Sequence, residues 1–150
     1  MLDAKTLSQL MLSFGSMSNK KLQKICYYVY SWYLAVYAER IADIQFEAWV
    51  HGPVSREIYN MYKEYGWENI PCYRGFIPVN ADTIDFARTV WGIYGKYSAD
   101  QLEEMSHREC PWKKAREGYG RYESSDNPLK DKDIYYFFHS KYVEKECIHI

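Results

Sequence analysis

The fold is decided by one stretch, residues 18–38, which reads SNKKLQKICYYVYSWYLAVYA. Its apolar side chains recur every three or four residues and also line a second side, a pattern typical of a helix packed on most of its circumference. Ser18 is a residue type that caps helix N-termini. Only a narrow stripe is expected to stay uncovered, formed by Lys20, Lys24, Ser31 and Ala35. The sequence therefore predicts a central helix over 18–38.

Shorter segments with helical spacing lie on both sides of this stretch, and glycines at 15, 66 and 95 end three of them. Further helices are predicted over residues 3–13, 54–65, 82–94 and 98–107, with a helical turn at 111–116 and a last helix from Asp131. A chain of 150 residues is the length of one domain. We expect a mainly α fold, a single compact domain of five to six helices spanning residues 1–150.

The period changes to two over residues 44–50, which predicts a strand. One face holds Ile44, Phe46, Ala48 and Val50, and the other holds Gln45, Glu47 and Trp49. Residues 67–79 are broken by prolines and a glycine but are long enough for one short strand that could pair with the first. The prediction is a small antiparallel β element near residues 44–50.

Composition excludes several classes of protein. Nineteen Lys and Arg oppose twenty Asp and Glu, so no strong field favours a polyanion. The four cysteines lie far apart without metal-ligand spacing, and we expect neither a metal nor a cofactor. No apolar run reaches membrane-spanning length, and we expect a cytoplasmic protein with reduced thiols. Sixteen Tyr and five Trp indicate an aromatic core or, alternatively, a surface for protein contacts.

No motif for nucleophilic, metal or phosphate chemistry is present, so we expect a protein that is not an enzyme. The best alternative is a small hydrolase or transferase that uses His107, Glu109 and Cys110, although helix capping accounts for the His and Glu more simply. A weaker alternative is a nucleic-acid-binding regulator. It would use two basic clusters, formed by Lys20, Lys21 and Lys24 and by Lys113, Lys114 and Arg116.

Three blocks of sequence together resemble a known family. They are KLQKICYY at 21–28, EAWVHGPV at 47–54, and a third over 90–116 that contains SHRECPWK at 106–113. In order and spacing they are similar to the Panacea domain, which occurs in SocA-type antitoxins and in many phage-associated proteins. The resemblance is strongest over residues 18–140.

The resemblance implies a mostly helical domain that binds and neutralises a cognate protein toxin, which is usually encoded beside it. Neutralisation could block the active surface of the toxin or hand the toxin to a protease system, and the sequence leaves both routes open.

Two groups of residues stand out within the blocks. If the face with Phe46 is the core, Glu47, Trp49 and His51 form a partner-binding face, on which Trp49 is an exposed anchor. The alternative is that Trp49 lies beneath residues 67–79 as part of the core.

The second group is expected to be a structural corner, because Pro111 prevents the preceding helix from continuing. It comprises Ser106, His107, Glu109, Pro111 and Trp112. We expect Trp112 to pack on the central helix near Tyr28 or Trp32. We expect His107 to bond a backbone carbonyl or Glu109.

Overall fold

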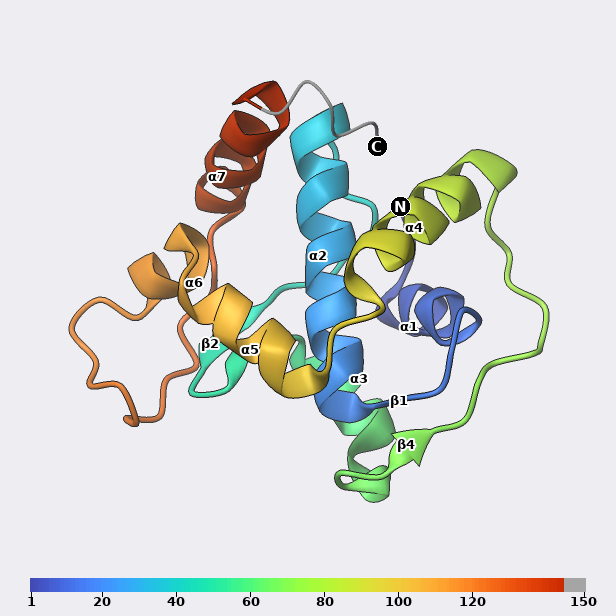
Figure 1. Ribbon diagram of the computed structural model, residues 1–150, viewed down its shortest axis with the longest axis horizontal. Coiled ribbons are helices and arrows are strands. Elements are labelled where there is room, and N and C mark those ends of the chain that lie inside the picture. Colours follow the sequence, from blue (N-terminus) through green and yellow to red (C-terminus); the bar gives the residue numbers. More distant parts are fainter. Residues whose placement is uncertain (145–150) are drawn as a thin grey trace.

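The computed structural model describes residues 1–144, which contain seven α-helices, and six of these surround or flank the seventh, a central helix (Figure 1). They are α1 (Ala4–Leu12), α2 (Asn19–Tyr37), α3 (Arg56–Tyr62), α4 (Ala81–Tyr94), α5 (Ala99–His107), α6 (Cys110–Ala115) and α7 (Asp131–Glu144), with a 3-10 turn at Lys63–Tyr65. The mainly α prediction is confirmed. The helical turn predicted at 111–116 is the short helix α6, and Ser98 with Gln101 forms a capping box on α5.

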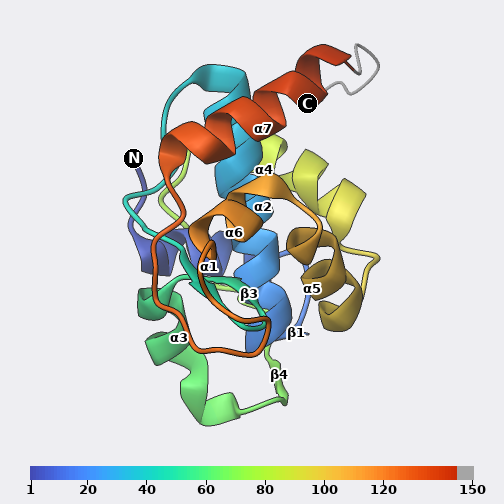
Figure 2. The same ribbon diagram turned by 90° about the vertical axis from the view of Figure 1, so that its left-hand side faces the viewer.

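Helix α2 is the predicted central helix, and it packs against α1, α3, α4, α5 and α7 (Figures 1 and 2). The Ser18 side chain caps α2 by accepting a hydrogen bond from the Lys21 amide. The stripe that we expected to stay uncovered is nevertheless largely buried. Strand β3 (Gly52–Val54) covers Lys24, and α7 covers Ala35, whose carbonyl lies 3.2 Å from His139 Nδ1.

Two antiparallel pairs of short strands complete the fold. Strand β1 (Met17–Ser18) pairs with β4 (Asn69–Ile70), and β2 (Glu47–Trp49) pairs with β3 (Gly52–Val54), with Ala48 opposite Pro53. The β element near residues 44–50 is confirmed, but its expected pairing with residues 67–79 is wrong. A two-residue turn and Gly52, with φ +109°, reverse the chain at once, so β2 pairs with the segment that follows it.

The other edge of β2 is covered by the loop that precedes α7. The Ala48 amide donates to the Asn127 carbonyl at 2.8 Å, and the Leu129 amide donates to the Phe46 carbonyl at 2.8 Å. Ile44, Phe46 and Ala48 are buried as predicted, whereas Val50 is half-buried in the turn. Strand β2 is therefore held on both edges.

Most of the aromatic residues on α2 belong to the core. Tyr28 stacks on Tyr94 with 4.1 Å between ring centroids, and Trp32 Nε1 donates to the Tyr94 hydroxyl at 2.8 Å. Some rings remain outside, and Trp67 is 91% exposed. None of the helices in residues 1–144 combines the length and apolarity that a membrane span requires.

Candidate functional site

The three sequence blocks meet at the β2–β3 hairpin. From α2, Lys24 Nζ donates to the Pro53 carbonyl at 3.3 Å. From α6, Trp112 Nε1 donates to the Trp49 carbonyl at 2.9 Å, and the guanidinium of Arg116 donates to the Ala48 carbonyl at 2.8 Å. Helices α2, α5 and α6 therefore support one small hairpin, which lies beside α5 and α6 in both views (Figures 1 and 2).

Trp49 lies half-buried on the outer side of this hairpin in a preformed cluster. Its Nε1 donates to Glu47 Oε1 at 2.9 Å, and Arg56 donates to the same oxygen at 2.8 Å while its guanidinium lies 5.2 Å from the Trp49 ring centroid. Tyr59 meets the ring edge-on, with 5.1 Å between centroids. Trp49 is thus covered by α3 and not by residues 67–79, and its ring is held in one orientation.

His51 occupies the tip of the hairpin, and its side chain is 72% exposed. Its Nδ1 lies 3.1 Å from Oε1 of Glu103 on α5. Beside it, a hollow of about 700 Å³ is lined by Trp49, Val50, His51, Arg56, Tyr119, Ser124, Ser125 and Asp126. We call these lining residues, with Glu47 and Tyr59, the hairpin surface.

Arg116 fixes the loop over residues 118–128 that forms one wall of the hollow. The side chain is only 5% exposed, and besides the Ala48 carbonyl it donates to the backbone oxygens of Gly120, Arg121 and Glu123. The planar guanidinium supplies several donors in fixed directions, which a lysine could not match. Arg116 is therefore committed to the protein interior and is not part of a phosphate-binding cluster.

The other basic residues near the hairpin are also largely paired. Lys20 forms ion pairs with Asp100 at 2.7 Å and Glu103 at 2.6 Å, and Lys114 lies 3.3 Å from Asp133. These contacts neutralise two of the six basic residues that the nucleic-acid alternative would present to phosphate.

The corner between α5 and α6 has a different arrangement from the one we expected. Trp112 is buried as predicted, but its ring stacks on His107, with 4.1 Å between centroids, and its Nε1 reaches the hairpin. No ring pair joins Trp112 to Tyr28 or Trp32 in the described residues. Pro111 lies in the first turn of α6, and the indole of the residue that follows it is bonded to β2.

Glu109 makes the contact with α2 in place of Trp112. It accepts a 2.9 Å hydrogen bond from the Tyr28 hydroxyl, and burial raises the pKa of its carboxyl to about 7. Ser106 is buried and donates to the Glu103 carbonyl at 2.8 Å, which ties the corner to the preceding turn of α5. The corner is thus anchored on one side to α2 and on the other to β2.

His107 forms no hydrogen bond with Glu109 in the described residues, but its ring has the backbone of Val50 as a hydrogen-bond partner, in line with the expected bond to a backbone carbonyl. Burial has the largest effect on the His107 ring and lowers its pKa, whereas the charge of Glu103 and the hydrogen bond with Val50 raise it. Its Nε2 is buried without a partner of hydrogen-bond geometry in the described residues. The imidazole ring of His107 also stacks on the indole of Trp112.

The set expected for a hydrolase or transferase is not assembled. Across residues 1–144, no hydrogen bond or ion pair joins the side chains of His107, Glu109 and Cys110. Glu109 faces Tyr28, His107 faces the indole of Trp112, and Cys110 is exposed. No group of three or more His, Cys, Asp and Glu side chains in this range is arranged to hold a metal ion.

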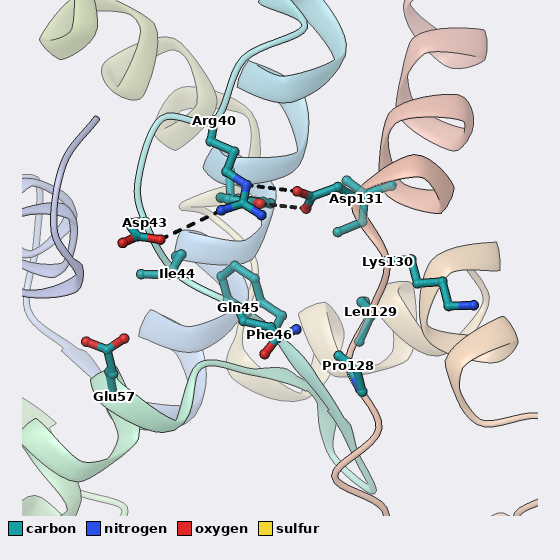
Figure 3. A pocket seen from close by; sticks show the side chains of 12 residues that line it. Arg40, Asp43, Ile44, Gln45, Phe46, Glu57, Pro128, Leu129, Lys130 and Asp131 are labelled. Carbon is teal, nitrogen blue, oxygen red and sulfur yellow. Dashed lines mark hydrogen bonds and ion pairs between the residues drawn. The ribbon is translucent and has the colours of Figure 1, made fainter.

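A second hollow, of about 530 Å³, lies between residues 43–46 and 128–131 (Figure 3). Arg40 spans its rim, with Nε 2.9 Å from Asp131 and a second nitrogen 3.7 Å from Asp43. The Tyr30 hydroxyl donates to Asp131 at 2.6 Å. Because these charges compensate one another, the contacts tie the start of α7 to α2 and to the segment before β2.

Three residues that support the hairpin and its surface are not indicated by the sequence: Lys24, Arg56 and Arg116. No local signal distinguishes Lys24 from Lys20 and Lys21, which lie on the same helix. The contacts of the two arginines depend on tertiary structure and leave no local pattern.

Comparison with known proteins gives one match. The family model described as antitoxin SocA-like, Panacea domain, matches residues 22–113, which include most of the three blocks and all of the β2–β3 hairpin. No curated protein matches the chain, and no solved structure does.

Proposed function

The chain belongs to the SocA-like antitoxin family of Panacea-domain proteins, and on that premise we propose that it binds and neutralises a cognate protein toxin in the cytoplasm. We propose further that it does so as a single domain and through the hairpin surface. The observation that carries this proposal is the convergence of the three family blocks on one hairpin, which holds Trp49 and His51 at the outside of the molecule.

The chemistry of the hairpin surface is that of a protein-binding site. Tryptophan, tyrosine and arginine carry much of the binding free energy in protein interfaces. Here Trp49, Tyr119 and Arg56 line a hollow with both apolar and polar walls, and Tyr59 packs edge-on against the Trp49 ring. The contacts of Trp49 with Glu47 and Arg56 fix its ring before any partner binds, which reduces the entropy lost on association.

The test is rescue from toxicity combined with co-purification. The gene beside this one would be expressed alone and with this chain, and the toxic product would then be purified through a tag on the chain. We expect restored growth together with a stable complex. Rescue without a complex, or a toxic neighbour that is not silenced, would contradict the proposal.

A variant pair of Trp49→Ala and Trp67→Ala locates the binding surface. Trp49 lies on the hairpin surface, whereas Trp67 is a highly exposed tryptophan outside it. We expect Trp49→Ala to lose both rescue and complex formation, and Trp67→Ala to retain both. The reverse pattern would place the toxin elsewhere.

The route of neutralisation can be read from the amount of toxin in the same cells. If the antitoxin blocks the toxin directly, the toxin level stays constant during rescue. If it hands the toxin to a protease system, the toxin level falls and recovers when the protease is removed. We propose direct blocking, because the preformed surface is suited to a stable complex.

A further inference from the structure

Lys24 is a buried lysine beneath the hairpin. It lies on α2 and is only 1% exposed. An ammonium group has three donors, yet the single hydrogen bond of Nζ in residues 1–144 is the 3.3 Å contact with the Pro53 carbonyl. No carboxylate of the described residues forms an ion pair with it. A charge buried in this way is costly.

The hairpin closes directly on this side chain. A Cβ atom placed on Gly52 would lie 2.5 Å from Lys24 Cε and 2.9 Å from Ser106 Oγ. Position 52 therefore has no room for a side chain, and the backbone of β3 lies directly against the lysine stem. Lys24 can reach water only if the hairpin moves away from α2 and α5.

The charged groups around Lys24 do not compensate the positive charge of its ammonium form. Lys20 on α2 disfavours the ammonium form, and Glu103 on α5 favours it more weakly. Glu103 itself pairs with Lys20 at 2.6 Å and contacts His51 at 3.1 Å. His107, also on α5, is influenced in turn by Lys24. Burial is the largest effect and lowers the pKa of Lys24 to about 7.

We infer that Lys24 is the positioning residue of the hairpin surface: it holds the closed hairpin as a neutral amine, so that opening the hairpin takes up a proton. Only the consequence of this inference for toxin binding rests on the proposed function, because the hairpin carries Trp49 and His51. In the open hairpin the amine meets water and regains its ordinary pKa of 10.5. Opening therefore becomes harder as the pH rises from about 7 toward 10.5.

Hydrogen exchange of the free protein tests this linkage without any partner. The readout is the protection factor of the β2 and β3 amides, which corrects for the intrinsic dependence of exchange on pH. Between pH 7.5 and 8.5 the wild type should gain up to about tenfold in hairpin protection, since one proton is linked to opening. Helix α7 provides an internal reference in the same spectra.

Lys24→Met should abolish the pH dependence of the hairpin while leaving it closed. Lys21→Met is the matched control, because Lys21 lies on the same helix but contacts the Gly95 carbonyl and the Trp91 ring. It should keep the wild-type profile. A Lys24→Met profile that still rises with pH, or a Lys21→Met profile that becomes flat, would overturn the inference.

A second measurement uses the wild type alone and does not depend on the folding of a variant. NMR of carbon-labelled lysine should show one side chain that titrates near pH 7 in the folded protein, far below the others. If every lysine titrates near its ordinary pKa, or if hairpin protection in the wild type is independent of pH, Lys24 is not the proton-linked group. Either result would leave the toxin-binding proposal untouched, and failed toxin binding would leave this one untouched.

Discussion

Trp112 and Trp49 are joined by a hydrogen bond of 2.9 Å from the indole Nε1 of the first to the backbone oxygen of the second. The bond connects the corner between α5 and α6 to the hairpin that carries the proposed toxin-binding residues. It leaves the Trp49 side chain free to face outward, because only the backbone of Trp49 is used. The stability of the corner and the position of the hairpin surface are therefore coupled.

Trp112→Ala should destabilise the fold by about 3 to 5 kcal/mol, because it removes a large buried ring and the hydrogen bond to β2. Trp112→Phe retains most of the ring and should cost about 1 to 3 kcal/mol. Urea unfolding monitored by circular dichroism measures both. If the Ala variant unfolds at the same urea concentration as the wild type, Trp112 does not clamp the corner.

Glu109→Gln should change how stability depends on pH. Burial raises the pKa of Glu109 from 4.5 to about 7 in the folded state, so the folded protein holds this proton more tightly than the unfolded chain does. Its contribution is most favourable below about pH 4.5, is lost as the pH rises to about 7, and stays lost above that.

The glutamine variant does not lose stability as the pH rises in this way, and its amide oxygen can still accept a hydrogen bond from the Tyr28 hydroxyl. Relative to wild type it should be more stable by about 2 to 3 kcal/mol at pH 8 and similar at pH 4.5. Urea unfolding at the two pH values gives the comparison, with exposed Glu104→Gln on α5 as the control. An equal stability difference at both pH values would show that Glu109 is not the titrating group.

Arg116→Met should release the loop over residues 118–128, because three backbone oxygens of the loop and that of Ala48 on β2 lose the donors that Arg116 supplies. Trypsin should then cleave after the exposed Arg121 at least tenfold faster than in the wild type, as expected when a loop opens more often. Lys113→Met removes an exposed neighbouring cation and should leave cleavage unchanged. Unaltered cleavage in Arg116→Met would mean that the loop is held by other contacts.

Comparing Gly52→Ala with Gly118→Ala separates the loss of stability caused by backbone strain from the loss caused by close packing. Both glycines have positive φ, +109° and +88°, but only Gly52 has neighbours, Lys24 and Ser106, within 3 Å of an added Cβ. Both variants should lose about 1 to 2 kcal/mol to strain, and Gly52→Ala a further 1 to 3 kcal/mol to overpacking. Equal losses in thermal unfolding would show that the hairpin does not press on Lys24.

The helices were predictable from sequence because their signals are local. The apolar spacing of residues 18–38 and the capping pair Ser98 and Gln101 act within a few turns of chain, and each produced the expected element. The alternation at Ile44, Phe46 and Ala48 likewise identified the buried side of the segment that leads into and includes β2. Local patterns of this kind do not depend on what covers them.

The spacing of apolar residues in a segment does not show which other elements will cover it. Lys24 is polar and lies on the least apolar side of α2, yet β3 closes over it. The indole of Trp112 is hydrogen-bonded to β2, a tertiary contact that no local pattern around Pro111 indicates. The residues of the proposed site were partly identified, but the arginines and the lysine that support them required the structure.

The central claim is that the hairpin surface binds the toxin. The most direct test is the dissociation constant of the purified toxin for three proteins: the wild type, Trp49→Ala and Trp67→Ala. We expect Trp49→Ala to weaken binding at least tenfold, which corresponds to about 1.4 kcal/mol, and Trp67→Ala to bind as the wild type does. Wild-type affinity in a folded Trp49→Ala protein, with loss of binding in Trp67→Ala, would contradict the account.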